Sequence, residues 1–248
     1  MKRLLIITCV CLLMAGANAQ QYVGSKGLIH VPTAEMDTAG VARIGAQFIP
    51  KYIIPDRMVI DHDNEKFDSW TNYLSITPFR WIQLSYGYTL WKFHKNKKPQ
   101  NEVGFYAKDR YFSLRLQPLQ ERKWWPSVVV GGNDVWGSKD DGESGSNFYR
   151  NYYVALSKHF NLWDAATLGT HVTYRKWKLD SNKKWDNAVG GLTLSPTFLP
   201  ELRLVGEYDG DNVNFGADCT IYHYFLVQAA MIRGKHFTGG LSLLIPLL

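Results

Sequence analysis

The chain has 248 residues, a formal net charge of +6 and 46% hydrophobic residues. Of its three cysteines, Cys9 and Cys11 lie in the apolar N-terminal stretch and only Cys219 lies beyond it, which excludes a framework of disulfides. The basic excess is mild and falls in predicted loops rather than along a helix, so we expect no nucleic-acid partner. After residue 20, no apolar stretch approaches the about 20 residues that a membrane helix needs.

Residues 1–19 have the pattern of a secretory signal peptide. Lys2 and Arg3 precede an apolar stretch over residues 4–14, and the small-x-small sequence at 17–19 precedes Gln20. About a dozen apolar residues are too few to span a bilayer, which argues against a membrane anchor. A lipoprotein signal would need a cysteine just after the apolar stretch, whereas both cysteines lie inside it. We therefore expect cleavage after residue 19.

From residue 41 onward, apolar and polar residues alternate with the period of two that is typical of β-strands. Each run has about eight to twelve residues, close to what a tilted barrel strand needs to cross a bilayer. The preceding residues 20–40 are predicted to form an N-terminal segment in the periplasm or in a barrel lumen. Twelve runs are recognisable, near 41–48, 69–77, 81–91, 110–118, 125–136, 147–158, 165–176, 187–195, 201–208, 212–220, 223–233 and 236–246.

The connections between the first nine runs alternate in length. Connections near 49–68, 92–109, 137–146 and 177–186 are long and polar, whereas those between them are short, as at 78–80 and 198–200. Outer-membrane barrels show this alternation, with long loops outside the cell and tight turns in the periplasm. The three connections nearest the C-terminus are all short and do not follow the rule.

All nine tryptophans lie where a run begins or ends. Membrane barrels place such rings in two girdles at the level of the lipid headgroups, whereas a soluble β-sandwich would bury several in mid-strand. We therefore predict an all-β fold, a transmembrane antiparallel β-barrel of about 12 strands over residues 41–248, in the bacterial outer membrane. The tryptophans assigned to the membrane interface are Trp70, Trp91, Trp136, Trp177 and Trp185 in the outer girdle, and Trp81, Trp125 and Trp163 in the periplasmic girdle.

The alternation directs several charged residues into the predicted lumen, which becomes net basic: Arg43, Arg115, Arg175 and Arg203, with Glu207 as a partial counterweight. These residues fit two interpretations. A barrel of about a dozen strands is narrow, so they could form a salt-bridged filling. Alternatively, they could line a path that favours anionic sugars.

No spacing typical of a strong catalytic or metal-binding motif occurs in the sequence. His171 and Ser157, on neighbouring predicted strands, are the best Ser/His pair, but a barrel with seven histidines offers such pairs readily. The acidic stretch 207–212 could hold calcium through carboxylate oxygens. Its Asp-Gly and Asp-Asn pairs are also ordinary hairpin-turn chemistry, which explains every residue. We expect no catalytic residue, no metal and no cofactor.

A series of short motifs resembles YjbH-like proteins. The first is Gly27-Leu28-Ile29-His30-Val31-Pro32-Thr33-Ala34-Glu35-Met36, followed by Gly40. In chain order the others are Pro78-Phe79, Lys108-Asp109, Pro126 leading to Gly131-Gly132-Asn133-Asp134, Tyr153 with Ser157-Lys158, and Glu207-Tyr208-Asp209. The resemblance covers nearly the whole chain after the signal. It implies an outer-membrane barrel associated with exopolysaccharide production or secretion, and it supplies no catalytic residues.

Together these observations predict a non-enzymatic component of exopolysaccharide export or surface-glycan assembly. Its expected partners are outer-membrane lipid, anionic polysaccharide and other envelope export proteins. Two alternatives stay open. One is a small porin for anionic oligosaccharides, and the other is an outer-membrane hydrolase that uses His171.

Overall fold

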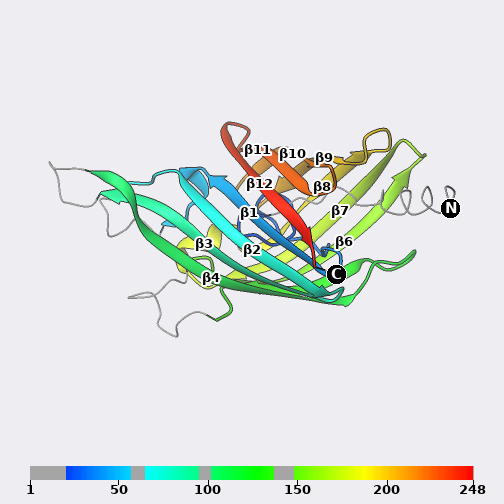
Figure 1. Ribbon diagram of the computed structural model, residues 1–248, viewed down its shortest axis with the longest axis horizontal. Helices are drawn as coiled ribbons and strands as arrows, with labels where there is room; N and C mark the ends of the chain where they lie inside the picture. The colour runs from blue at the N-terminus through cyan, green and yellow to red at the C-terminus, as the bar shows by residue number, and fades with distance from the viewer. Residues whose placement is uncertain (1–20, 57–64, 95–101, 137–147, 248) are drawn as a thin grey trace.

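The computed structural model describes residues 21–56, 65–94, 102–136 and 148–247, so the predicted signal peptide lies outside the described residues. In these ranges twelve antiparallel strands follow one another around a closed barrel, in chain order (Figure 1). They are β1 (Val41–Ile49), β2 (Ser69–Phe79), β3 (Ile82–His94), β4 (Val103–Leu119), β5 (Ser127–Asn133), β6 (Asn151–Leu162), β7 (Ala166–Trp177), β8 (Asn187–Pro196), β9 (Leu202–Tyr208), β10 (Val213–Ile221), β11 (Phe225–Ile232) and β12 (His236–Pro246). Two short 3-10 helices, η1 (Lys51–Ile53) and η3 (Asp180–Trp185), lie in connections.

The first and last strands close the barrel. β1 pairs with β12 from Val41↔Pro246 to Phe48↔Gly239, and with β2 on its other side. In the described residues every strand therefore has two neighbours and the sheet has no edge strand, which is what a sheet inside a bilayer requires. None of the helices in the described ranges is long and apolar enough to span a membrane.

The outer face of the barrel is apolar and the inner face is largely polar. Along β11, exposed and buried residues alternate without a break. The other strands each place at least one large hydrophobic side chain outside: Ile44, Leu74, Leu84, Phe112, Val130, Val154, Val172, Leu192, Leu204, Phe215 and Leu241. The buried set includes many serines, threonines and charged residues. This inverts the arrangement of a soluble sandwich and is that of a transmembrane barrel, as predicted.

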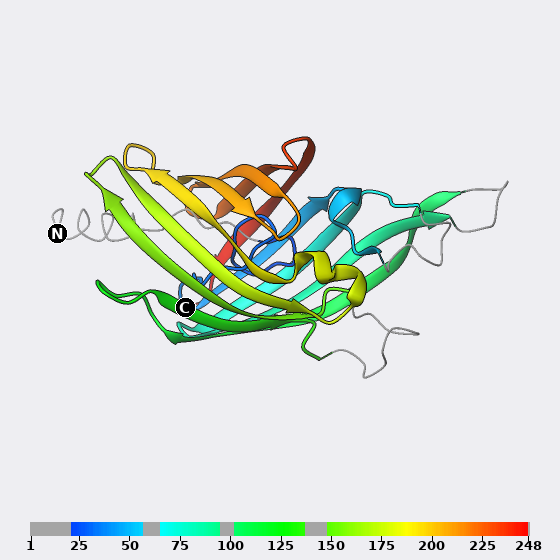
Figure 2. The same cartoon turned by 180° about the vertical axis from the view of Figure 1, so that it is seen from behind.

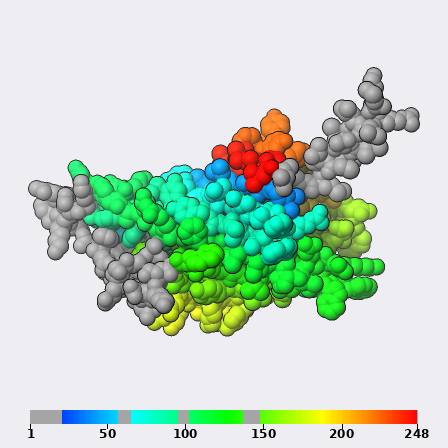
Figure 3. Space-filling view, turned by 60° about the horizontal axis from the view of Figure 1, so that its bottom comes forward, coloured from blue at the N-terminus to red at the C-terminus, as the bar shows by residue number. Residues whose placement is uncertain are grey.

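The predicted twelve strands are confirmed, but the connection predicted at 92–109 was wrong. β3 and β4 continue through most of it as a long paired hairpin, from Leu90↔Lys108 to His94↔Val103, with an irregularity between Trp91 and Lys92. Charged residues in segment 92–109 interrupt the alternation of apolar and polar residues, so the sequence did not indicate a strand. Strands can nevertheless pair beyond the lipid-facing part of the barrel, because any residue except proline can make the backbone hydrogen bonds of the ladder. Figure 1 shows this hairpin reaching past its neighbours, and Figure 3 shows one face of the packed outer surface.

The two ends of the barrel differ. We call the end with connections 50–68, 95–102, 134–150 and 178–186 the long-loop end, and the opposite end the short-turn end. Residues 120–126 connect β4 to β5 at the short-turn end. Gly40 also lies there, where its N–H donates to the Thr77 carbonyl.

Residues 21–40 lie inside the barrel, and we call them the plug. Figure 2 shows them as a dark blue loop surrounded by strands. The plug turns back on itself through a bridge between Gly27 and Pro32, and the Leu28 N–H donates to the Val31 carbonyl at 2.9 Å. Its buried side chains join the largest apolar cluster of the described residues, with members that include Tyr22, Val23, Leu28, Ile29, Ile49, Ile53, Tyr111, Tyr149, Trp177 and Trp185. The apolar core therefore lies inside the barrel, around the plug.

Candidate functional site

The tip of the plug is held by one carboxylate of the barrel wall. Ile29, His30 and Val31 direct consecutive backbone N–H groups at Glu207 of β9, at 2.9, 2.9 and 3.1 Å. The Asn214 amide of β10 donates to the same carboxylate at 2.9 Å. Consecutive N–H groups in a tight turn form a concavity suited to an anion. Glu207, which was predicted to line the lumen, thus anchors the tip of the plug.

The side chain of His30 adds a second anchor. Its Nδ1 lies 3.2 Å from Oδ2 of Asp209, its Nε2 lies 2.9 Å from the Tyr22 hydroxyl, and its ring meets Trp185 edge-on. Burial alone would raise the pKa of Asp209. Hydrogen bonding from His30 and its charge instead hold this pKa far below its ordinary value. Asp209 also accepts the N–H groups of residues 211 and 212, so it organises the turn between β9 and β10.

Arg175 of β7 joins three segments of backbone at the long-loop end. It donates to the carbonyls of His30 in the plug, Trp185 in η3 and Asp209 in the β9–β10 turn, each at 2.9 Å. A planar guanidinium with five donors is suited to such divergent acceptors. Arg175 is buried, so these three bonds replace its hydration.

Arg115 of β4 holds the part of the plug that follows its tip. It donates to the carbonyls of Thr33 and Glu35 and to the Gln83 side chain. From β7, Thr173 donates to the Pro32 carbonyl at 2.6 Å. The plug backbone between residues 32 and 35 is therefore held by two separate strands.

The remaining two predicted lumen arginines pair with acidic side chains. Arg203 of β9 contacts Glu35 of the plug at 3.0 Å and Asp218 of β10 at 3.1 Å. Arg43 of β1 binds Asp37 of the plug at 2.7 Å. All five predicted lumen residues are buried, and each contacts the plug. Their counter-charges Glu35, Asp37 and Asp218 were not predicted from the sequence. Of the three, only Asp218 could have been found, because the alternation of β10 directs it inward.

The tryptophans divide into two groups. Five of the eight that were assigned to the membrane interface have exposed rings: Trp70, Trp81, Trp125, Trp136 and Trp163. Trp91 is half-buried and packs against Phe148. Assignment of Trp177 and Trp185 to the interface was wrong, because their exposed fractions are 5% and 1% and both pack in the cluster around the plug. Trp177 shares the inward face of β7 with Arg175, two residues earlier, and Trp185 lies on η3.

Ser157 and His171 meet, as their register across β6 and β7 requires. The Ser157 hydroxyl lies 2.8 Å from His171 Nδ1, and the Ala34 N–H of the plug donates to the same hydroxyl at 2.8 Å. Both residues have an exposed fraction of 1%. The geometry of a Ser/His pair is present, but the plug covers it, and the serine serves as an acceptor for the plug backbone.

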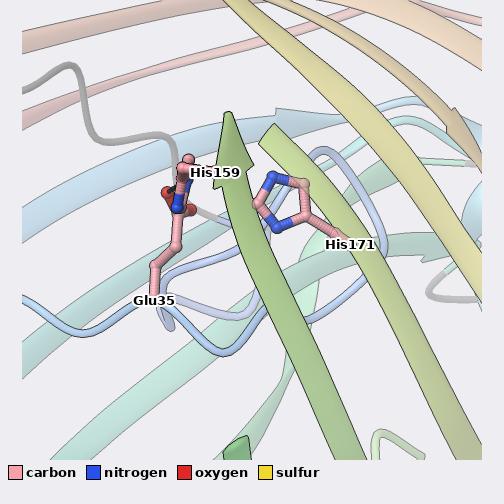
Figure 4. A group of neighbouring side chains, drawn as sticks. All are labelled: Glu35, His159 and His171. Carbon is pink, nitrogen blue, oxygen red and sulfur yellow. Dashed lines mark ion pairs between the residues drawn. The ribbon is translucent and has the colours of Figure 1, made fainter. Parts of the chain in front are cut away.

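His171 also belongs to a group at the short-turn side of the plug. Glu35, His159 of β6 and His171 of β7 place a carboxylate oxygen and two ring nitrogens within 4.8 Å of one another (Figure 4). His159 contacts two carboxylates, Glu35 at 3.3 Å and Glu121 at 2.6 Å. Burial alone would raise the pKa of Glu121, but hydrogen bonds from His159 and Lys158 hold it below its ordinary value. This group joins plug, wall and the 120–126 turn.

Several solved structures are similar to this chain at low sequence identity. The outer membrane phospholipase A from Escherichia coli has 12% identity and a TM-score of 0.41, covering 84% of this chain and 95% of that chain. The Salmonella typhi outer membrane phospholipase dimer with bound calcium has 11% identity and a TM-score of 0.37, covering 84% and 90%. The low-pH structure of Pseudomonas putida OprB has 9% identity and a TM-score of 0.32, covering 82% and 90%.

No curated protein matches the chain. A family profile does, over residues 19–195, which include the plug and the strands from β1 through most of β8. The matched region thus contains both partners of most plug contacts described above. The chain belongs to the YjbH family, which is described as exopolysaccharide biosynthesis protein YbjH.

Proposed function

We propose that this chain is a plugged barrel of the bacterial outer membrane and a non-enzymatic component of exopolysaccharide export or surface-glycan assembly. Family membership supplies the link to exopolysaccharide biosynthesis. The apolar outer face supports a location in lipid. The single observation that carries the proposal is the plug, which fills the lumen with the chain's own residues and binds every predicted lumen arginine.

The plug favours a scaffold or closed gate over a constitutive porin. A porin for anionic oligosaccharides would need solvent-facing cations along its path. In this structure Arg115, Arg175 and Arg203 donate to plug carbonyls, and Arg203 and Arg43 pair with plug carboxylates. Passage of a sugar would require the plug to leave, and that step would be the natural point of control by an envelope partner.

Burial of the Ser/His pair supports the non-enzymatic part of the proposal. A hydrolase needs its nucleophile within reach of substrate, and the Ser157 hydroxyl is instead enclosed between His171 and the Ala34 N–H. A hydrolase and a scaffold therefore differ in what happens when Ser157 loses its hydroxyl.

The test is complementation of a deletion strain, with exported exopolysaccharide as the readout. We expect deletion to lower the yield, and wild type and Ser157→Ala to restore it equally. Ser127→Ala is the matched control, because Ser127 pairs with Ser157 across β5 and β6 but has no histidine partner. Heat-modifiable gel mobility of each variant shows that the barrel is folded. Restoration by Ser127→Ala but not by a folded Ser157→Ala whose plug residues 32–37 keep wild-type protection from hydrogen exchange would contradict the non-enzymatic role. Unchanged export in the deletion strain would contradict the proposal as a whole.

A further inference from the structure

Three potential metal ligands converge from separate parts of the fold. Glu35 comes from the plug, His159 from the end of β6 and His171 from β7, with ligand atoms within 4.8 Å of one another (Figure 4). One carboxylate and two imidazoles form a donor set that suits zinc and related transition metals, whereas calcium and magnesium prefer oxygen alone.

Each histidine has one ring nitrogen held by an outer partner. Nδ1 of His159 lies 2.6 Å from Glu121, whose other oxygen accepts the His159 backbone N–H at 2.9 Å. Nδ1 of His171 lies 2.8 Å from the Ser157 hydroxyl, and its Nε2 lies 3.2 Å from the Thr193 hydroxyl, a contact that an ion bound at Nε2 would replace. Metal-binding histidines almost always use one nitrogen in this way, which fixes the ring and directs the other nitrogen at the ion.

The two carboxylate oxygens of Glu35 likewise have different partners. Its Oε2 accepts from Arg203 at 3.0 Å, whereas its Oε1 lies 3.3 Å from Nε2 of His159. That second spacing exceeds the about 2.7–2.9 Å of a charge-assisted hydrogen bond. It is close to the roughly 3.3 Å between two ligands of a tetrahedral ion whose bonds are about 2.0–2.1 Å long, and the ligand atoms of the group that lie up to 4.8 Å apart would draw together as the ion binds.

Gly169 provides the space in which the two imidazoles approach each other. It pairs with His159 on one side and with Thr193 on the other. A Cβ at this position would lie 2.3 Å from Thr193 Oγ1, 2.8 Å from His171 Nε2 and 3.1 Å from His159 Cδ2, so the glycine makes room for the Thr193 hydroxyl and for both imidazoles. A glycine within a strand often marks a close approach of this kind.

We propose that Glu35, His159 and His171 bind one divalent transition-metal ion of the zinc type, with water as the fourth ligand, and that this ion fastens the plug to β6 and β7. The exposed fractions of the His159 and Glu35 side chains are 32% and 15%, so the ion has access from solvent at the short-turn end. The proposal concerns closure of the lumen and holds whether or not the chain acts on exopolysaccharide.

Zinc chloride titrated into the chelator-treated full chain, folded in detergent, tests the proposal by calorimetry. We expect one ion per chain, and cobalt(II) should give the visible absorption of a four-coordinate site. Both His159→Gln and His171→Gln should weaken binding by roughly 100-fold or more, and Glu121→Gln by about 10–100-fold through loss of the outer partner. Binding of zinc by His223→Gln should equal that of wild type, because His223, in the β10–β11 turn, does not belong to the ligand group.

Folding of each variant is checked by heat-modifiable mobility. If a histidine variant does not fold, Glu35→Gln tests the same site from the plug, since it keeps the side-chain size and one carbonyl oxygen. Zinc should also slow hydrogen exchange of plug residues 32–37 in wild type but not in Glu35→Gln. Absence of stoichiometric binding in wild type, or equal binding by His223→Gln and the folded ligand variants, would overturn the proposal.

Discussion

Replacement of Glu207 by alanine should release the tip of the plug without unfolding the barrel. The substitution removes the acceptor of three buried backbone N–H groups, those of Ile29, His30 and Val31. Each unsatisfied buried donor costs about 1–3 kcal/mol. Water that enters the space left by the side chain would satisfy some of these N–H groups, so we expect the free energy that holds the tip in place to fall by about 3–5 kcal/mol in total. The strand ladders do not depend on Glu207 side-chain bonds, so the loss should concentrate in the plug.

Hydrogen exchange read by mass spectrometry measures this loss directly. A cost of about 3–5 kcal/mol corresponds to a fall in protection of roughly 10²-fold or more at the three tip amides, at about 1.4 kcal/mol for each tenfold change. Glu201→Ala, at the turn before β9, is the matched control and should leave these amides protected. Unchanged protection of the tip in Glu207→Ala would refute the anchoring role. Equal loss of protection in β9 and the tip would refute the localisation.

Three further predictions concern stability. Arg175→Lys should lower the free energy of unfolding by about 2–4 kcal/mol, because a single ammonium cannot reach all three carbonyls, and the heat-modifiable transition should fall in temperature. Burial raises the pKa of Asp134 to about 6, so stability should decline as the pH rises from about 4 to about 6, and urea unfolding of Asp134→Asn should lack that decline. Trp185→Ala should cost about 3–5 kcal/mol in detergent, whereas Trp163→Ala, at a side chain 95% exposed, should change unfolding by less than about 0.5 kcal/mol.

The strands could be predicted from the sequence because apolar lipid-facing residues and polar inward-facing residues alternate along each strand of a membrane barrel. β12 was predicted with the bounds it has, and β1, β7, β8 and β9 to within a residue at each end. Prediction was poorest where the apolar face ends but pairing continues, as in β3 and β4, and at β5 and β6. The run at 125–136 includes Trp136, which lies beyond β5, and the run predicted at 147–158 lies four residues later, at Asn151–Leu162. In these strands the predicted bounds followed the alternation of side chains, whereas the actual bounds are set by backbone hydrogen bonds.

The interior could be predicted only in part. Period two gave the inward direction of Arg175 and Glu207, and the same rule applied to Trp177 would have placed that ring inside as well. Apart from Asp218 beside Arg203, what the arginines bind could not be predicted, because most of their other acceptors are backbone carbonyls and carboxylates of the plug, which has no periodicity. The contact of Glu35 with His159 is of the same kind, since nothing local connects these two residues.

Occupation of the lumen by residues 21–40 is the central claim, and the most direct test is conductance of the full chain in planar lipid bilayers. The plug, held by Glu207, Arg115, Arg175 and Arg203, predicts insertion without steady channel openings in wild type, and openings in Glu207→Ala. Stable open channels in the wild-type chain, unaffected by Glu207→Ala, would contradict a plugged barrel and would favour the porin.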